Sequence, residues 1–202
     1  MKVLSVSLFR VPKEKGSSEP VLLCEGLELS SFGFFEKRSV REMLQFFSKT
    51  VVGRVTPGQR VTVDQEQMQD YKVHVHVRAD GLGATLTADA EYPTRAAYSA
   101  LAAIMGDFEN AVPDWQLMPG QIDFPPLNDA ILKVQDPASY DKITKIQRDL
   151  DDTQGVLHQT VDNLLERGEK LDNLVERSDD LSKQSKMFYK QARKTNSCCT
   201  IT

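Results

Sequence analysis

The sequence predicts an α+β domain followed by a long coiled-coil helix, and three observations support this prediction. Residues 3–10 alternate side chains with the two-residue period of a β-strand, whereas residues 40–51 repeat apolar side chains at helical spacing. Beyond residue 138, apolar residues recur at alternating steps of three and four, which is the period of a coiled-coil stripe. The chain has 202 residues and is 40% hydrophobic, which provides enough apolar material for one domain of ordinary size.

The first elements of the domain are two strands and a helix. After the strand at residues 3–10, a polar loop leads to a second strand at Val21 to Ser30. Ser39 and Glu42 fit a capping box, in which each side chain bonds a backbone amide of the first helical turn. They would open a helix of about 14 residues that ends near Gly53.

Three more strands and two helices complete the domain. The strands are predicted at Arg60 to Gln67, Tyr71 to Ala79 and Ala84 to Ala90. Their short spacing and the turn at Asp80-Gly81 make them antiparallel neighbours. From Pro93 the pattern changes to a helix that continues through Phe108, and a short helix follows around Leu127 to Gln135. Pro137 separates this short helix from the coiled-coil stripe.

The coiled-coil stripe contains one charged position, Arg167. Counted from Arg167 in both directions, its other layers are Ile143, Ile146, Leu150, Thr153, Leu157, Thr160, Leu164, Leu171, Leu174, Ser178, Leu181, Ser185, Phe188, Ala192 and Thr195. A buried guanidinium is costly unless its donors find acceptors, and identical helices in register would place arginine against arginine. The stripe therefore favours unlike partner helices that supply acceptors, although periodicity alone also permits an arginine at the solvated flank of an ordinary helix.

The run LLERGEKLDNLVERSDDL, Leu164 to Leu181, resembles the central segment of the R-SNAREs, the synaptobrevin family. The resemblance implies that Arg167 is the ionic-layer residue of a four-helix bundle whose Qa, Qb and Qc helices each contribute a glutamine. It also implies that the other layers zipper toward the lipid anchors and draw two membranes together. A phosphate on Ser178 or Ser185 would block this zippering, although small residues are also ordinary bundle layers.

The segments SSFGFFEKRSV, Ser30 to Val40, and AEYPTRAAY, Ala90 to Tyr98, are similar to the longin domain, and so is the order of elements. The resemblance implies a profilin-like fold, with a five-stranded antiparallel sheet between one helix and two. The predicted organisation is a longin domain at 1–127, a linker with the end of a short helix at 128–137, an R-SNARE motif at 138–195 and a lipidated tail at 196–202.

Two adjacent cysteines in the tail predict attachment to a membrane by lipids. Cys199 opens a prenylation box, Cys199-Thr200-Ile201-Thr202, and Cys198 is placed for a palmitate. One lipid chain binds marginally, whereas two hold firmly. Thr200 and Thr202 depart from the usual residues of the box and leave the type of isoprenoid open. The match to prenylated longin R-SNAREs without a transmembrane anchor implies a peripheral protein of the cytosol and of the cytoplasmic face of Golgi, endosomal, vacuolar or lysosomal membranes.

An exposed stripe and a free isoprenoid both promote aggregation, so we expect the longin domain to fold back on the SNARE segment in the cytosol. The predicted autoinhibitory groove consists of Met43, Phe46 and Thr50 on a second apolar flank of the first helix. The residues beside the stripe that would meet this groove are Val161, Leu165 and Val175. The alternative is that Phe46 belongs only to the core of the domain.

Other classes of function are disfavoured. The net charge of -4 gives no reason to expect a nucleic-acid partner, and no apolar stretch approaches the roughly 18 to 20 residues of a membrane span. His74 and His76 point to one strand face together with Lys72 and Arg78, which favours a solvated face over a metal pair. Cys24 is predicted to be a buried structural thiol, and we infer no active site, metal or cofactor. The alternative function is a longin-type scaffold that binds a small GTPase or coat and has a homo-oligomeric coiled coil.

Overall fold

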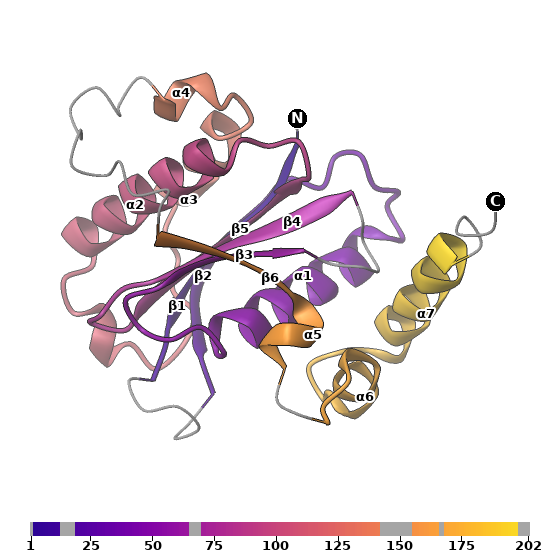
Figure 1. Ribbon diagram of the computed structural model, residues 1–202. Coiled ribbons are helices and arrows are strands. Elements are labelled where there is room, and N and C mark those ends of the chain that lie inside the picture. The colour runs from indigo at the N-terminus through magenta and orange to yellow at the C-terminus, as the bar shows by residue number, and fades with distance from the viewer. Residues whose placement is uncertain (1, 13–18, 65–69, 142–154, 166–167, 198–202) are drawn as a thin grey trace.

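The computed structural model describes residues 2–12, 19–64, 70–141, 155–165 and 168–197 (Figure 1). Among these residues, a six-stranded sheet has the order β2-β1-β5-β4-β3-β6. The strands are β1 (Val3–Arg10), β2 (Val21–Leu27), β3 (Arg60–Asp64), β4 (Tyr71–Val77), β5 (Leu82–Asp89) and β6 (Val156–Thr160). The pairs among β1 to β5 are antiparallel, whereas β6 runs parallel to β3 at the edge of the sheet.

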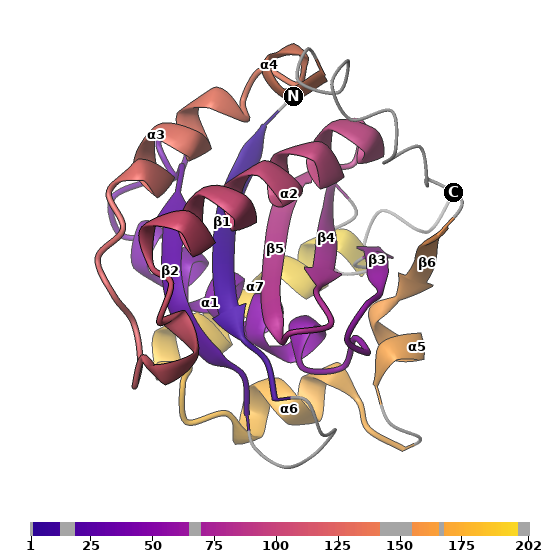
Figure 2. The same ribbon diagram turned by 90° about the vertical axis from the view of Figure 1, so that its left-hand side faces the viewer.

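Helices cover both faces of the sheet (Figure 2). The first helix, α1 (Lys37–Val52), lies on one face, and α2 (Thr94–Ala111) and α3 (Pro126–Lys133) lie on the other. The shorter helices of the domain are η2 (Trp115–Leu117) and α4 (Ala138–Asp141). The C-terminal helices, α5 (Val161–Leu164), α6 (Leu171–Arg177) and α7 (Lys183–Ser197), lie on the α1 side of the molecule.

Two large apolar clusters follow from this layering, one on each face of the sheet. On the α2 side, Leu101, Ile104 and Phe108 repeat at helical spacing and are buried with the strands. On the α1 side, Phe47 and Val51 are buried with strand residues in the second cluster. The predicted α+β fold is therefore confirmed, with five antiparallel strands between one helix and two.

The beginning of α1 differs from the predicted capping box. The helix starts at Lys37, and Glu36 occupies the N-cap position without a side-chain capping bond. Ser39 lies inside the first turn and is buried. Glu42 accepts hydrogen bonds from Arg38 one turn earlier and from the C-terminal segment. The prediction was wrong because the helix already begins at Lys37, so Ser39 has helical geometry and cannot occupy the N-cap position.

The C-terminal segment also differs from the single long helix expected for residues 138–195. Its described part is divided into β6, α5, α6 and α7, and residues 142–154 lie outside the description. Gly168 has a φ of 94°, a left-handed conformation that interrupts a helix. An amphipathic helix in water needs an apolar partner for stability. Here the partner is the domain itself, and the segment bends to follow its surface.

The two predicted histidines of β4 do not form a solvated face. His74 is completely buried, and its Nδ1 lies 3.1 Å from Oγ1 of Thr62, which in turn lies 3.1 Å from the hydroxyl of Tyr98. Burial, together with the charge of Lys72, lowers the pKa of His74 to about 4. The solvated-face prediction was wrong for His74 because α2 covers that face of the sheet, with Tyr98 against the imidazole ring.

Cys24 is buried in β2, as predicted, and burial raises the pKa of its thiol to about 12. Among the described residues, no group of three or more His, Cys, Asp or Glu side chains is arranged to hold a metal ion. Within the same part of the chain, no helix combines the length and apolar character needed to cross a bilayer.

Candidate functional site

The candidate site is the surface where α1 meets the C-terminal segment. Met43 and Phe46 are buried on α1, and Thr50 beside them is half-buried. The residues of the C-terminal segment that are buried in the same cluster are Val161, Leu165, Leu171, Val175, Leu181 and Tyr189. Met43 and Phe46 of the predicted groove therefore lie in one apolar cluster with the three predicted residues beside the stripe, whereas Thr50 is not part of that cluster. The ring centroids of Phe47 and Tyr189 are 6.3 Å apart within it.

Several layers of the stripe are also buried at this surface. Leu171 and Leu181 are 2% and 5% exposed, and Ser185 is completely buried. Leu164, Leu174, Ser178, Phe188 and Ala192 are half-buried. Leu157 remains 44% exposed, and Thr160 is half-buried and caps α5 by accepting a hydrogen bond from the amide of Asn163. The stripe is therefore divided between the domain and solvent, unlike the continuous face expected of a coiled coil.

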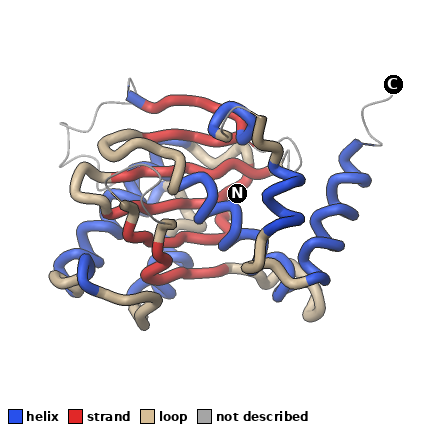
Figure 3. Tube along the Cα trace, turned by 90° about the horizontal axis from the view of Figure 1, so that it is seen from below, coloured by secondary structure: helices blue, strands red, loops and turns tan. Residues whose placement is uncertain are grey.

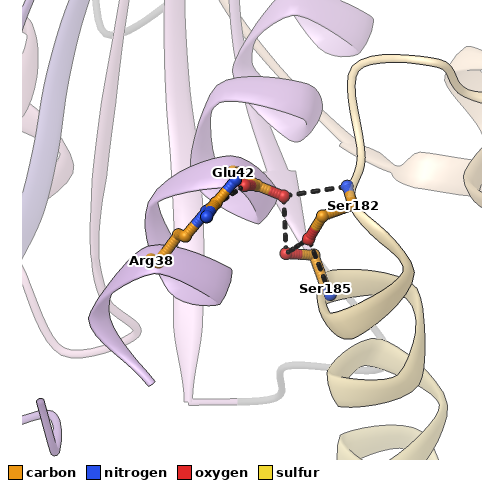
Figure 4. Close-up of polar contacts among 4 residues, drawn as sticks. All are labelled: Arg38, Glu42, Ser182 and Ser185. Atoms are coloured by element: carbon orange, nitrogen blue, oxygen red, sulfur yellow. Dashed lines mark hydrogen bonds and ion pairs between the residues drawn. The ribbon is translucent and has the colours of Figure 1, made fainter. Parts of the chain in front are cut away.

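Glu42 is the polar centre of the contact (Figure 4). One oxygen of its carboxylate accepts hydrogen bonds from the amide of Ser182 at 2.9 Å and from the hydroxyl of Ser185 at 2.7 Å. The other oxygen accepts one from Nε of Arg38 at 3.0 Å. Burial raises the pKa of Glu42, but these hydrogen bonds outweigh it and lower the pKa to about 2. The carboxylate therefore holds the start of α7 to α1 in its charged form.

Two ion pairs lie on either side of the apolar contact. Nζ of Lys49, on α1, is 2.9 Å from a carboxylate oxygen of Asp180, just before α7. A guanidinium nitrogen of Arg54, after α1, is 2.9 Å from a carboxylate oxygen of Glu169, just before α6. Each pair joins the domain to a connection between helices of the segment. Such partly exposed pairs contribute little energy, but they fix the register of the segment on α1.

A strand completes the contact at the edge of the sheet. β6 pairs with β3 over its whole length, from Arg60 opposite Val156 to Asp64 opposite Thr160. Figure 3 shows the sheet from below, with α7 standing beside it. An unpaired edge strand exposes backbone donors and acceptors, and β6 satisfies them. The backbone of residues 156–160 therefore makes sheet bonds in this structure that it would lose in a continuous helix.

The remaining predicted site residues lie outside the described part of the chain. These are Arg167, the layers Ile143, Ile146, Leu150 and Thr153, and the tail residues Cys198 and Cys199. Thr195 belongs to α7, but the placement of its side chain is not described. The ionic layer and the lipid sites consequently remain predictions from the sequence.

Sequence reasoning missed several residues of the site. It did not anticipate the pairing of β6 with β3, the two ion pairs, or the contact made by Glu42. One signal was present, because Gly155 interrupts the helical pattern directly before residues 156–160, where β-branched Val156 and Thr160 also disfavour a helix. No sequence pattern marks Glu42 as a partner of Ser182, since the residues are 140 positions apart.

Replacing Glu42 with glutamine should weaken the contact by about 1.5–3 kcal/mol, the usual contribution of a hydrogen bond to a charged group. The pKa of Glu42 is lowered in this contact, so its charge stabilises the contact above the ordinary pKa of 4.5, and the effect is lost as pH falls toward about 2. Thermal unfolding of both proteins across this range would measure the difference. Glu176→Gln, which removes the exposed partner of Lys190, is the control and should have a smaller effect.

An equal unfolding temperature for the wild-type protein and Glu42→Gln at neutral pH would contradict the role assigned to Glu42. So would a difference between them that grows as the pH falls below 4.5.

Comparisons with known proteins cover the whole chain. The synaptobrevin family model matches residues 142–200, and the longin model, described as a regulated-SNARE-like domain, matches residues 29–131. The chain is 46% identical over 204 residues to Synaptobrevin homolog ykt6 of Schizosaccharomyces pombe. It is 44% identical over 204 residues to VAMP-like protein YKT61 of Arabidopsis thaliana, and 42% identical over 212 residues to Synaptobrevin homolog YKT6 of Saccharomyces cerevisiae. Each of these alignments covers 100% of both chains.

Proposed function

Because the chain belongs to the family of longin-domain synaptobrevin homologues, which are R-SNAREs of vesicle traffic, we propose that it drives docking and fusion by zippering with three Q-type helices. In this proposal, residues 138–195 supply one helix of the bundle. Arg167 provides the ionic layer, where three glutamines would accept its hydrogen bonds. Burial of the apolar layers supplies the free energy that brings the two membranes together.

The observation that carries the proposal is the burial of bundle layers against the domain. Leu171, Leu181 and Ser185 occupy the stripe that a partner helix would cover, and they are buried in the contact with α1. The same side chains cannot face the domain and the bundle at once. The folded-back segment and the assembled bundle therefore exclude each other, which makes the longin domain an autoinhibitor of the SNARE segment.

The tail supports membrane attachment in this proposal. Cys199 carries a prenyl chain and Cys198 a palmitate, and the two chains together hold the protein at the cytoplasmic face of an organelle membrane. With a single chain, binding is marginal and the protein returns to the cytosol. The closed form then keeps the stripe away from unintended partners.

Hydrogen-deuterium exchange of the full chain tests the proposed exchange of partners. When a set of three Q-type SNARE helices is added, the amides among residues 60–64 that bond β6 should lose protection, because β6 leaves the edge of β3, whereas those that bond β4 should keep it. The amides of residues 171–197 should become more protected at the same time. Protection of the antiparallel pair β1 and β5 is the internal control and should not change. Assembly of the bundle without exposure of β3 would contradict the proposed autoinhibition.

A further inference from the structure

The turn between β2 and α1 holds two aromatic rings in solvent. Phe34 is 85% exposed and Phe35 is 81% exposed, and their ring centroids lie 5.5 Å apart in an edge-to-face arrangement. Phe32, two residues earlier, instead packs against the small cluster that contains Val40 and Leu44. The turn therefore partly buries Phe32 and exposes the side chains of Phe34 and Phe35. Phe34 and Phe35 together are called the aromatic tip.

The backbone of this turn is fixed by hydrogen bonds. The carbonyl of Gly33 accepts bonds from the amides of Glu36 at 2.9 Å and Lys37 at 3.1 Å. The carboxylate of Glu36 accepts a bond from the amide of Gly33, also at 2.9 Å. Because these hydrogen bonds already order the backbone of the turn, binding through the exposed rings costs little further conformational entropy. The aromatic tip is thus preorganised for a ligand that is apolar at its surface.

Basic side chains border the aromatic tip. Lys37 lies two residues after Phe35 and is exposed, and the side chain of Arg38 is 78% exposed although it pairs with Glu42. The adjacent carboxylates remain charged but are held back by backbone amides, Glu36 by that of Gly33 and Glu28 by that of Ser30. The rings therefore lie beside cations that can meet an anionic surface.

The size of the aromatic tip favours a lipid surface over a protein. Two aromatic rings bury roughly 300–500 Å² when they are fully covered. A stable protein interface needs about 800 Å² from each partner, so the aromatic tip alone is too small. Apolar rings next to lysine and arginine are instead typical of segments that lie at the membrane interface. We propose that Phe34 and Phe35 insert into the interface of an anionic bilayer and form a protein contact with the membrane that is separate from the tail.

The position of the aromatic tip agrees with this proposal. α7, which leads into the C-terminal tail, lies on the same side of the sheet as α1 and the turn before it (Figure 1). The aromatic tip belongs to the domain and not to the SNARE segment, so it remains exposed whether or not the segment is released. The contact does not depend on covalent lipids and can be measured without them.

A tryptophan probe tests the insertion directly. The chain has a single tryptophan, Trp115, which is 2% exposed and cannot reach a bilayer in the folded protein. The full chain with Phe34→Trp, prepared without lipid modification, is mixed with phosphatidylserine-containing vesicles whose acyl chains are brominated. We expect quenching of the new tryptophan and none of Trp115 in the wild-type protein. If the fluorescence of Phe34→Trp is not quenched, the proposal is wrong.

Binding measurements with a matched pair of variants complete the test. The double variant Phe34→Ser with Phe35→Ser, the tip variant, should sediment with these vesicles at least about tenfold less. It lacks the two aromatic rings whose burial in the bilayer would favour binding. Leu117→Ser with Leu132→Ser removes two other exposed apolar side chains, which are 80% and 62% exposed on η2 and α3, and should bind as the wild type. All proteins should unfold at similar temperatures, because the altered side chains are exposed.

Equal vesicle binding by the wild-type protein and the tip variant would overturn the proposal. The proposal would also be overturned if the tip variant bound vesicles as the wild type does but no longer bound a soluble protein partner. The aromatic tip would then be a binding site for that partner. Assembly of the tip variant with Q-type helices should be normal. The membrane contact and the SNARE function can therefore fail independently of each other.

Discussion

Replacing Val175 with aspartate should release the C-terminal segment from the longin domain. Val175 is completely buried on α6, in the cluster that contains Phe46 and Phe47. A carboxylate there would be buried without a partner unless the segment separates from α1. A cost of about 3 kcal/mol would raise the ratio of open to closed molecules roughly a hundredfold. Limited proteolysis of residues 155–197 in the full chain should accelerate accordingly.

Asn173→Asp is the matched control for this change. Asn173 is exposed on the same helix, so the control introduces the same carboxylate without placing it in the contact. Its proteolysis should resemble that of the wild-type protein. If Val175→Asp and Asn173→Asp were cleaved at the same rate, the contact with α6 would not control release of the segment.

Because of its position, a change at Val175 tests release of the segment from the domain without affecting assembly with Q-type helices. Val175 lies beside the stripe, between the layers Leu174 and Ser178, so its replacement leaves the bundle face intact. Val175→Asp should therefore bind Q-type helices faster than the wild-type protein. Leu171→Asp should open the contact equally but fail to assemble, because Leu171 is both a predicted layer and a buried residue of the contact. Slow assembly of both variants would contradict the autoinhibition.

The fold of the domain could be predicted because the spacing of its apolar residues corresponds to a single folded structure. Alternating strands and helical runs specify which side chains face a sheet, and each strand and long helix predicted for the domain is present in the described chain. Phe46 shows where this reasoning reaches its limit. The sequence permits Phe46 to be either a groove residue or a core residue, and the cluster around Phe46 contains both sheet valines and residues of the C-terminal segment. Phe46 therefore belongs to the core of the domain and to the contact with the C-terminal segment at the same time.

The C-terminal segment was less predictable because its sequence serves two structures. The heptad pattern describes a bundle helix, and it correctly leaves Val161, Leu165 and Val175 free to face the domain. It does not reveal that residues 156–160 leave helical geometry to pair with β3. That choice depends on the unpaired edge of a distant strand, which no local pattern encodes. The hydrogen bonds of Glu42 depend in the same way on long-range geometry.

Arg167 should determine which proteins assemble with the chain. In the Val175→Asp background, which exposes the stripe, affinity capture from detergent-solubilised cells should recover three SNARE proteins of the glutamine type. Adding Arg167→Ala, Leu171→Asp and Leu174→Asp should abolish their recovery. The carboxylates would be buried among apolar layers, and the three glutamines would lose their charged donor. Mass spectrometry of the captured proteins measures the result.

Arg177→Ala is the control, because it removes an exposed arginine beside the stripe on α6 and should leave recovery unchanged. Arg167→Ala alone tests the ionic layer without new charges. It should weaken assembly rather than abolish it, since the apolar layers on both sides remain. Recovery of a small GTPase or a coat protein equally with every variant would favour the scaffold function. An arginine within the stripe would destabilise the homo-oligomeric coiled coil of such a scaffold, whereas a hetero-oligomeric bundle supplies the acceptors it needs.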